Sequence, residues 1–176
     1  MRTFVIGDVH GRCAQLNNLL ALLPRDETAD MLVFLGDLID RGPDAPGCVD
    51  HVLKLCCDNP ERVICLRGNH EQMLMDFIEG STNIWITPVT GGERTFEQYT
   101  GGALVVNREE DLDEARRKIE SSIPAAHLDF FHQTPFYYED DYAIYVHAGL
   151  DQGKHPRDTA PQACLRPTCW LSCRGR

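Results

Sequence analysis

The chain contains 176 residues, of which 27 are acidic and 17 are basic, so its formal net charge is −10. With 25% charged and 43% hydrophobic residues, the composition excludes a disordered chain, and the length suits one domain with a core of its own. The acidic balance argues against a nucleic-acid partner, because a phosphate backbone would be repelled unless a local basic patch received it. Binding of cations is compatible with this charge.

No run approaches the ~18 apolar residues that span a bilayer, and the first residues are too few and too polar for a secretory signal. We therefore expect no membrane association and a cytoplasmic location. In that compartment the eight cysteines are expected to be reduced thiols.

The first 80 residues predict three buried strands that alternate with three helices. Short β-branched and aromatic runs predict the strands, and leucine-rich helical spacing predicts the helices. The strands are expected over 3–7, 31–36 and 62–66, and the helices over 13–23, 48–57 and 71–79. This alternation predicts a largely parallel sheet, whose carboxyl end carries the chemistry.

The second half is more irregular. Residues 80–107 are rich in Gly and Thr and are expected to form an excursion over the sheet edge, with short helical turns. Two helices are predicted over 112–120 and 124–133. Strands over 136–139 and 142–147 flank an Asp-Asp turn, which is a hairpin signal.

Each of the first three predicted strands is followed by a polar cluster, at 7–11, 36–42 and 67–71. Parallel strands align their carboxyl ends, so these clusters should converge. Carboxylates a few ångströms apart repel each other, and a bound divalent cation relieves that repulsion. A mixture of Asp, His and Asn suits Mn²⁺, Fe²⁺ or Zn²⁺. Arg41 and Arg67 stand beside the proposed ligands with forked donors that fit phosphate.

Four motifs in these segments carry a family resemblance: Asp-x-His-Gly at 8–11, Gly-Asp-x-x-Asp-Arg-Gly at 36–42, Gly-Asn-His-Glu at 68–71 and Val-His-Ala-Gly at 146–149. Over roughly residues 1–160 the chain resembles the calcineurin-like metallophosphoesterases, and more narrowly the bacterial and phage phosphoprotein phosphatases. A segment containing Trp85, Thr95 and Tyr99 is also similar to one in bacterial members.

The resemblance implies an α/β fold, the four-layer αββα metallophosphoesterase sandwich, here lacking its C-terminal strands. It implies a catalytic domain over 1–162 and a divergent tail over 163–176. It also implies two divalent metal ions, with Mn²⁺ favoured and Fe²⁺ or Zn²⁺ as alternatives. The implied ligands are Asp8, His10, Asp37, Asn69 and His147, with Asp37 bridging the two ions.

By the same resemblance, His70 would protonate the leaving oxygen and Asp40 would orient it, while Arg41 and Arg67 would hold the phosphate. The implied activity is hydrolysis of phosphoserine or phosphothreonine in proteins, with small phosphoesters as further substrates. One alternative is a dinucleoside polyphosphate hydrolase, and another is an impaired remnant that acts as a binding protein. The sequence leaves the oligomeric state open.

The chain departs from the family near its end. Members carry a later Gly-His, whose histidine completes the second metal site, and this chain has no Gly-His dipeptide. We interpret the divergence near residue 162 as a truncation or frameshift that leaves the second metal short of a ligand. His155 is the one histidine after His147 and is a weak candidate replacement.

Two cysteine patterns are disfavoured. Cys56 and Arg62 have the spacing of a thiol phosphatase, but the residues between them include no glycine to cradle a phosphate. The C-terminal cysteines, Cys164, Cys169 and Cys173, do not have the paired spacing of a zinc site.

Overall fold

The computed structural model describes residues 1–166, and its first half is built from alternating strands and helices. In order these are β1 (Thr3–Ile6), α1 (Cys13–Leu22), β2 (Met31–Phe34), α2 (Ala45–Asp58), β3 (Val63–Cys65) and α3 (Asn69–Ile78). The strands form one parallel sheet in the order β1-β2-β3. The predicted parallel sheet is therefore confirmed, with element ends shifted by a few residues.

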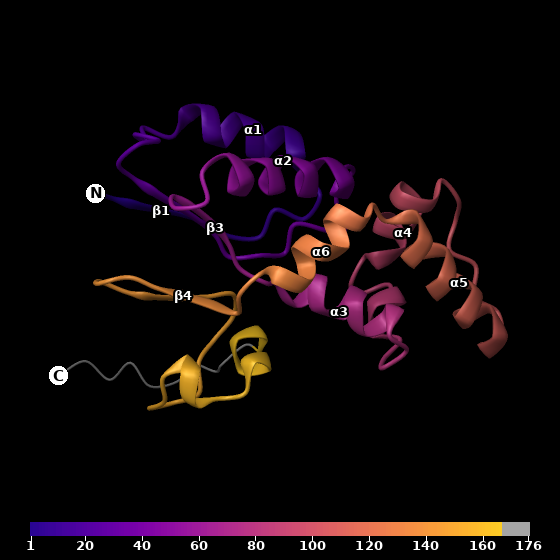
Figure 1. Cartoon of the computed structure of the whole chain (residues 1–176). Helices are drawn as coiled ribbons and strands as arrows, with labels where there is room; N and C mark the ends of the chain where they lie inside the picture. The colour runs from indigo at the N-terminus through magenta and orange to yellow at the C-terminus, as the bar shows by residue number, and fades with distance from the viewer. Residues whose placement is uncertain (167–176) are drawn as a thin grey trace.

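The sheet lies between helices and a hairpin (Figure 1). Helices α1 and α2 cover one face, and the antiparallel pair β4 (Tyr137–Glu139) and β5 (Ile144–Val146) lies on the other side. The mixed α/β class and the predicted hairpin are confirmed. Within residues 1–166 no strand follows β5.

The central strand anchors the core. All four residues of β2 are buried, and Leu32, Val33 and Phe34 are wholly so, because both faces of the strand are covered. The same continuous core extends to Phe77 of α3 and to Phe131. Burying such side chains contributes about 1.5–3 kcal/mol each relative to exposure, which fixes the sheet on which the site is built.

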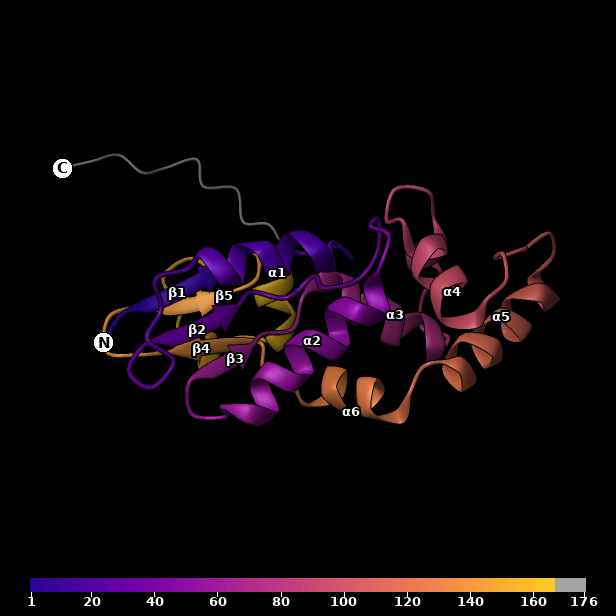
Figure 2. The ribbon, with the colours of Figure 1, turned by 90° about the horizontal axis from the view of Figure 1, so that it is seen from above.

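The segment expected to cross the sheet edge lies elsewhere. It forms η1 (Ile84–Ile86) and the nine-residue helix α4 (Gly92–Thr100), followed by α5 (Glu109–Ser122). These elements pack against α2 and α3 rather than along a strand, and Figure 2 shows α4 and α5 beyond the end of the sheet. The reason is burial of Trp85 and Phe96 in the common core.

Helix α6 (Ala125–Gln133) is tied to α2 and α4 by a buried histidine. The Tyr99 hydroxyl lies 2.8 Å from Nδ1 of His127, and Nε2 of the same ring lies 2.8 Å from Asp50. The two partners of His127 come from helices far apart in the sequence.

The chain after the hairpin folds back on the body. It forms the short helices η2 (Pro156–Asp158) and η3 (Pro161–Leu165), and the N–H of Ala148 donates to the carbonyl of Cys164 at 2.9 Å. The first residues of the predicted tail are thus packed. The rest of it, with Cys169 and Cys173, lies outside the described residues, and the boundary at 162 stays a prediction. No helix among residues 1–166 is long and apolar enough to cross a membrane.

An ion pair between Arg2 and Asp30 joins the start of β1 to the start of β2, and it predicts a dependence of stability on pH. Asp30 accepts hydrogen bonds from the side chain and backbone N–H of Arg2 and from the N–H of Asp26. These donors hold the pKa of Asp30 well below its usual range. Its contribution to stability is complete above the unfolded-state pKa and is lost as the pH falls toward the folded-state value.

We therefore expect Asp30→Asn to lower the thermal unfolding midpoint at pH 7, and the difference from wild type to shrink below about pH 4. Circular dichroism melts at several pH values measure both effects. Asp58→Asn, which removes an exposed pair with Lys54, should cost little at any pH. A deficit for Asp30→Asn that does not change with pH would contradict the prediction.

Candidate metal centre and active site

The loop after β1 is hydrogen-bonded to the loop after β2. The N–H groups of Val9 and His10 donate to the carbonyl of Asp37 at 3.0 and 2.8 Å, and the N–H of Gly11 donates to the carbonyl of Leu38 at 2.7 Å. These bonds bring the first two polar clusters of the sequence together. Their predicted convergence at the carboxyl end of the sheet is confirmed.

Four non-glycine residues in these loops have left-handed backbone conformations. The φ angles are 46° for His10, 55° for Asp37, 71° for Asp40 and 65° for Arg41. Such conformations cost on the order of 1–3 kcal/mol each and persist only where the surroundings enforce them. All four residues belong to the predicted site.

Glycines let the loops interlock. At Gly36 a Cβ atom would collide with the backbone of Gly68, and at Gly42 it would collide with the backbone of His10. Gly36 also has a positive φ of 100°. The glycines of the three motifs therefore serve close approach of the chain to itself.

The buried carboxylate of Glu71 holds the loop after β2 against the start of α3. It accepts the N–H groups of Asp37 at 2.8 Å, Leu38 at 2.7 Å, Ile39 at 3.3 Å and Gly68 at 3.0 Å. Burial and the neighbouring charge of Asp37 raise the pKa of Glu71 to about 7, against the opposing effect of these donors. Glu71 thus fixes the backbone from which the central ligand projects.

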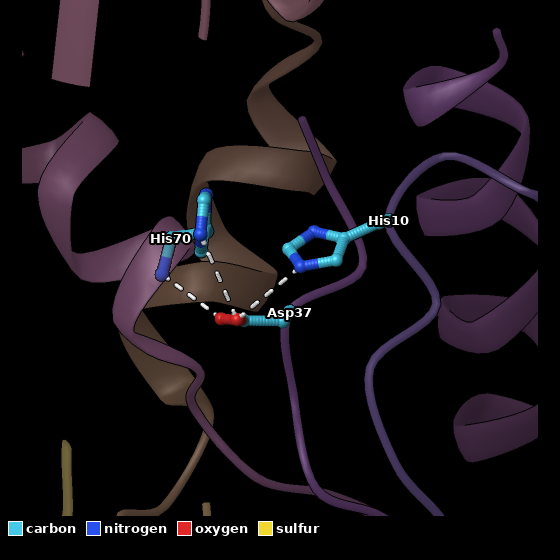
Figure 3. A group of neighbouring side chains, drawn as sticks. All are labelled: His10, Asp37 and His70. Carbon is cyan, nitrogen blue, oxygen red and sulfur yellow. Dashed lines mark hydrogen bonds and ion pairs between the residues drawn. The ribbon is translucent and has the colours of Figure 1, made fainter. Parts of the chain in front are cut away.

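Two groups of potential metal ligands share Asp37. One contains His10 and His70, as Figure 3 shows, and the other contains Asp8 and His147. Oδ2 of Asp37 lies 3.9 Å from Nε2 of His10, 3.9 Å from Nε2 of His70 and 3.4 Å from Nε2 of His147. The side chain is buried, so its carboxylate faces the three imidazoles with little contact with solvent.

The tautomers of two histidines suit metal binding. Nδ1 of His10 lies 2.9 Å from the carbonyl of Ile39, and Nδ1 of His147 lies 2.9 Å from the carbonyl of Leu35. A carbonyl only accepts, so each Nδ1 carries the proton and each Nε2 presents a lone pair to the cluster. Nε2 of His147 then faces Oδ1 of Asn69 at 2.7 Å. Two acceptors so close together fit a cation bound by both.

Arg41 lies over the Nε2 atoms of His10 and His70. One terminal nitrogen of its guanidinium is 2.9 Å from Nε2 of His10, and the other is 3.2 Å from Nε2 of His70. The residue is exposed at the mouth of the cluster. The positive charge of the Arg41 guanidinium at this point suits an anionic substrate that approaches the centre.

His70 and Asp40 form a buried pair. Nδ1 of His70 lies 2.6 Å from Oδ2 of Asp40, which is fully buried. Burial acts to lower the pKa of His70, but the hydrogen bond to Asp40 and the charges of Asp37 and Asp40 together raise it. The contact with Asp40 thus directs Nε2 of the ring toward the cluster.

Arg67 is placed differently from the expectation of a phosphate ligand. Its guanidinium is buried and donates to the carbonyls of Phe131 and His132 at 2.6 and 2.8 Å, and to Gln72 at 3.0 Å. It thereby holds the end of α6 against the end of β3. Contact with a phosphate would require it to leave these acceptors.

His155 is also directed elsewhere. Its Nε2 lies 3.0 Å from the carboxylate of Glu139 on β4, beside Arg157. Neither ligand group of the described residues includes it.

Comparison with known proteins identifies the family. The model of the calcineurin-like phosphoesterases matches residues 1–162. The chain belongs to this family. Its members use a dinuclear metal centre, in agreement with two ligand groups that share one carboxylate.

The relatives of this chain include two kinds of enzyme. A serine/threonine-protein phosphatase 1 of Salmonella typhimurium is 38% identical over 51% of this chain and 38% of its own length. A symmetrical bis(5'-nucleosyl)-tetraphosphatase of Nitrosomonas europaea is 28% identical over 85% of this chain and 45% of its own length. The chain thus spans less than half of each relative.

Solved structures share the fold. A protein serine/threonine phosphatase of Saccharomyces cerevisiae superposes with a TM-score of 0.54 at 18% identity, covering 93% of this chain and 47% of the other. At this identity the likeness concerns the fold alone.

The sequence does not predict the contacts that three residues make in the site. Glu71 was noted as part of a motif, without its function as an acceptor for the loop after β2. Trp85 and Thr95 were noted for their resemblance to a bacterial segment, but both contact Asp40. A tryptophan in a polar, glycine-rich segment is the one feature of the sequence that indicates a buried contact there. The fold shows that the contact is with Asp40.

The position of Asp37 in both ligand groups gives a metal-binding prediction. Mn²⁺ should raise the thermal unfolding midpoint of the wild-type chain, since a ligand at 100 times its Kd stabilises by about 2.7 kcal/mol. Asp37→Asn should lose this stabilisation. Asp129→Asn, an exposed change on α6, should keep it. An equal shift in Asp37→Asn and wild type would contradict a shared ligand.

Glu71 gives a stability prediction. In Glu71→Gln the amide N–H₂ would face backbone N–H donors, so the free energy of unfolding in urea should fall by about 1–3 kcal/mol. The exposed change Glu61→Gln is the control. Unfolding midpoints that coincide for the two variants would show that the carboxylate does not hold the loop.

Proposed function

We propose that this chain carries the catalytic centre of a metal-dependent phosphomonoesterase that acts on phosphoserine and phosphothreonine in proteins. The observation that carries the proposal is the convergence of two ligand groups on Asp37, with the His70–Asp40 pair and Arg41 at their edge. Metal ligands, an acid and a phosphate-binding cation are the parts that this hydrolysis needs.

The metal ions would be held by the chain's converging acceptors: Asp8, His10, Asp37, Asn69 and His147. We propose Mn²⁺ as the ion, with Fe²⁺ or Zn²⁺ as alternatives, because the donors are oxygens and imidazole nitrogens rather than thiolates. When bound, two such cations lower the pKa of a water molecule and offset the charge of the reacting phosphate. Asp37 suits the bridging position because a carboxylate has two oxygens to share.

The remaining residues handle the substrate. Arg41 would turn from the two imidazoles to the phosphate oxygens, whose charge it matches. His70 would donate the proton on Nε2 to the leaving oxygen, while Asp40 keeps the proton on Nδ1 in place. A serine alkoxide is a poor leaving group, so this proton matters. Arg67 would reach the phosphate by releasing the carbonyls of Phe131 and His132 to which it donates.

A second candidate is hydrolysis of dinucleoside polyphosphates. It is favoured by the Nitrosomonas europaea tetraphosphatase, whose similarity extends over 85% of this chain, compared with 51% for the Salmonella typhimurium phosphatase. The same metal centre serves both reactions. A cytoplasmic location, and the absence of nucleic-acid and membrane partners, stay predictions.

His70→Asn gives the direct test. Wild-type protein should hydrolyse p-nitrophenyl phosphate and a phosphoserine peptide when Mn²⁺ is added, and His70→Asn should lose about 10²–10⁴-fold in peptide turnover. His132→Asn, an exposed change at the end of α6, is the matched control. Equal rates in wild type and His70→Asn would indicate a contaminating phosphatase.

Substrate competition separates the two candidates. Turnover of the phosphoserine peptide above that of diadenosine tetraphosphate supports the first, and the reverse supports the second. A chain that binds Mn²⁺ but turns over neither substrate would be the impaired binding protein that the sequence left as an alternative.

A further inference from the structure

The carboxylate of Asp40 has more partners than its role toward His70 requires. Oδ2 of Asp40 is hydrogen-bonded to Nδ1 of His70, and Oδ1 accepts the hydroxyl of Thr95 at 2.7 Å. The indole nitrogen of Trp85 lies 3.1 Å from both oxygens. Asp40 is fully buried, so water does not compete for these positions. Both additional donors come from the 84–95 segment, outside the sheet and its motifs.

We propose that Trp85 and Thr95 are positioning residues, which fix the plane of the Asp40 carboxylate and through it the tautomer of His70. The inference rests on the proposed role of His70 as the general acid. It extends that role to the segment formed by η1 and α4. It requires no contact of either residue with substrate or metal.

The direction of each hydrogen bond supports this role. An indole nitrogen can only donate. The hydroxyl of Thr95 accepts the backbone N–H of Asp40 at 2.9 Å, so its own hydrogen is available for Oδ1. Asp40 therefore faces two donors that leave Oδ2 directed at Nδ1 of His70. That arrangement keeps a proton on Nδ1 of His70, in the neutral ring as in the charged one, and directs Nε2 toward the cluster.

The segment itself is held firmly in place. The hydroxyl of Thr90 donates to the carbonyl of Trp85 at 2.6 Å, and a Cβ on Gly92 would collide with the indole. The N–H of Arg41 donates to the carbonyl of Gly91 at 3.3 Å. The indole also packs on Phe77, with ring centroids 5.4 Å apart. The donors to Asp40 thus belong to a packed unit.

The proposal predicts a change in leaving-group dependence. A general acid matters for a serine alkoxide and little for p-nitrophenolate, which leaves without a proton. Misplacing His70 should therefore reduce peptide hydrolysis far more than hydrolysis of p-nitrophenyl phosphate. A merely structural loss would lower the folded fraction and reduce both rates by the same factor.

The variants are Trp85→Phe and Thr95→Val, which remove one donor each and keep most of the buried volume. We expect kcat/KM for a phosphoserine peptide to fall about 10-fold or more, with the roughly 10²–10⁴-fold contribution of a general acid as the upper limit, and that for p-nitrophenyl phosphate to fall less than about 3-fold. Thr95→Ser, which keeps the hydroxyl, should restore the wild-type ratio. Tyr99→Phe, which removes another hydroxyl of α4, should leave the ratio unchanged. Equal losses on both substrates would overturn the proposal.

A second measurement needs neither metal nor turnover. Long-range ¹H–¹⁵N spectra of histidine rings report which nitrogen carries the proton, and His70→Asn identifies the His70 signals. In wild type we expect the Nδ1–H form, and in Trp85→Phe and Thr95→Val a mixture of tautomers. An unchanged tautomer in both variants would overturn the proposal. A wild-type chain without turnover would instead refute the proposed function, and the spectra would still decide the role of Trp85 and Thr95.

Discussion

The structure around the site depends on the buried carboxylate of Asp37. Three imidazole nitrogens lie within 4 Å of one of its oxygens, and its backbone is fixed by Glu71 on one side and by the loop after β1 on the other. A buried negative charge is costly unless cations or donors compensate it. The ordered lone pairs of His10, Asn69 and His147 are acceptors, so they add to the demand for a cation.

The same constraint explains the strained backbone. Left-handed conformations occur at Asp37, Asp40 and Arg41 of one short loop, which we propose to supply a metal ligand, a buried hydrogen-bond acceptor and a phosphate-binding cation. The buried core of the sheet and the hydrogen bonds that Glu71 accepts offset the cost of these strained conformations. The loops that carry the candidate site thus follow directly on the strands of the buried sheet.

The relatives that match this chain include enzymes named for different substrates. The matched Salmonella typhimurium phosphatase and Nitrosomonas europaea tetraphosphatase both extend well beyond it. The site built on the parallel sheet is therefore compatible with either proposed substrate class. Trp85 and Thr95 contact Asp40 of this site from outside the sheet.

The sequence by itself predicted the βαβ order from alternating apolar runs, because short-range spacing is written in the order of residues. Through a family resemblance its motifs also named candidate metal ligands and, in His70, a candidate acid; the ligands are Asp8, His10, Asp37, Asn69 and His147. Only the tertiary structure decided which distant groups meet. Burial of Trp85 and Phe96 in the core brings Trp85 against Asp40, and the guanidinium of Arg67 donates to carbonyls at the end of α6. Such contacts follow from the complementarity of buried surfaces far apart in the chain, which no local pattern records.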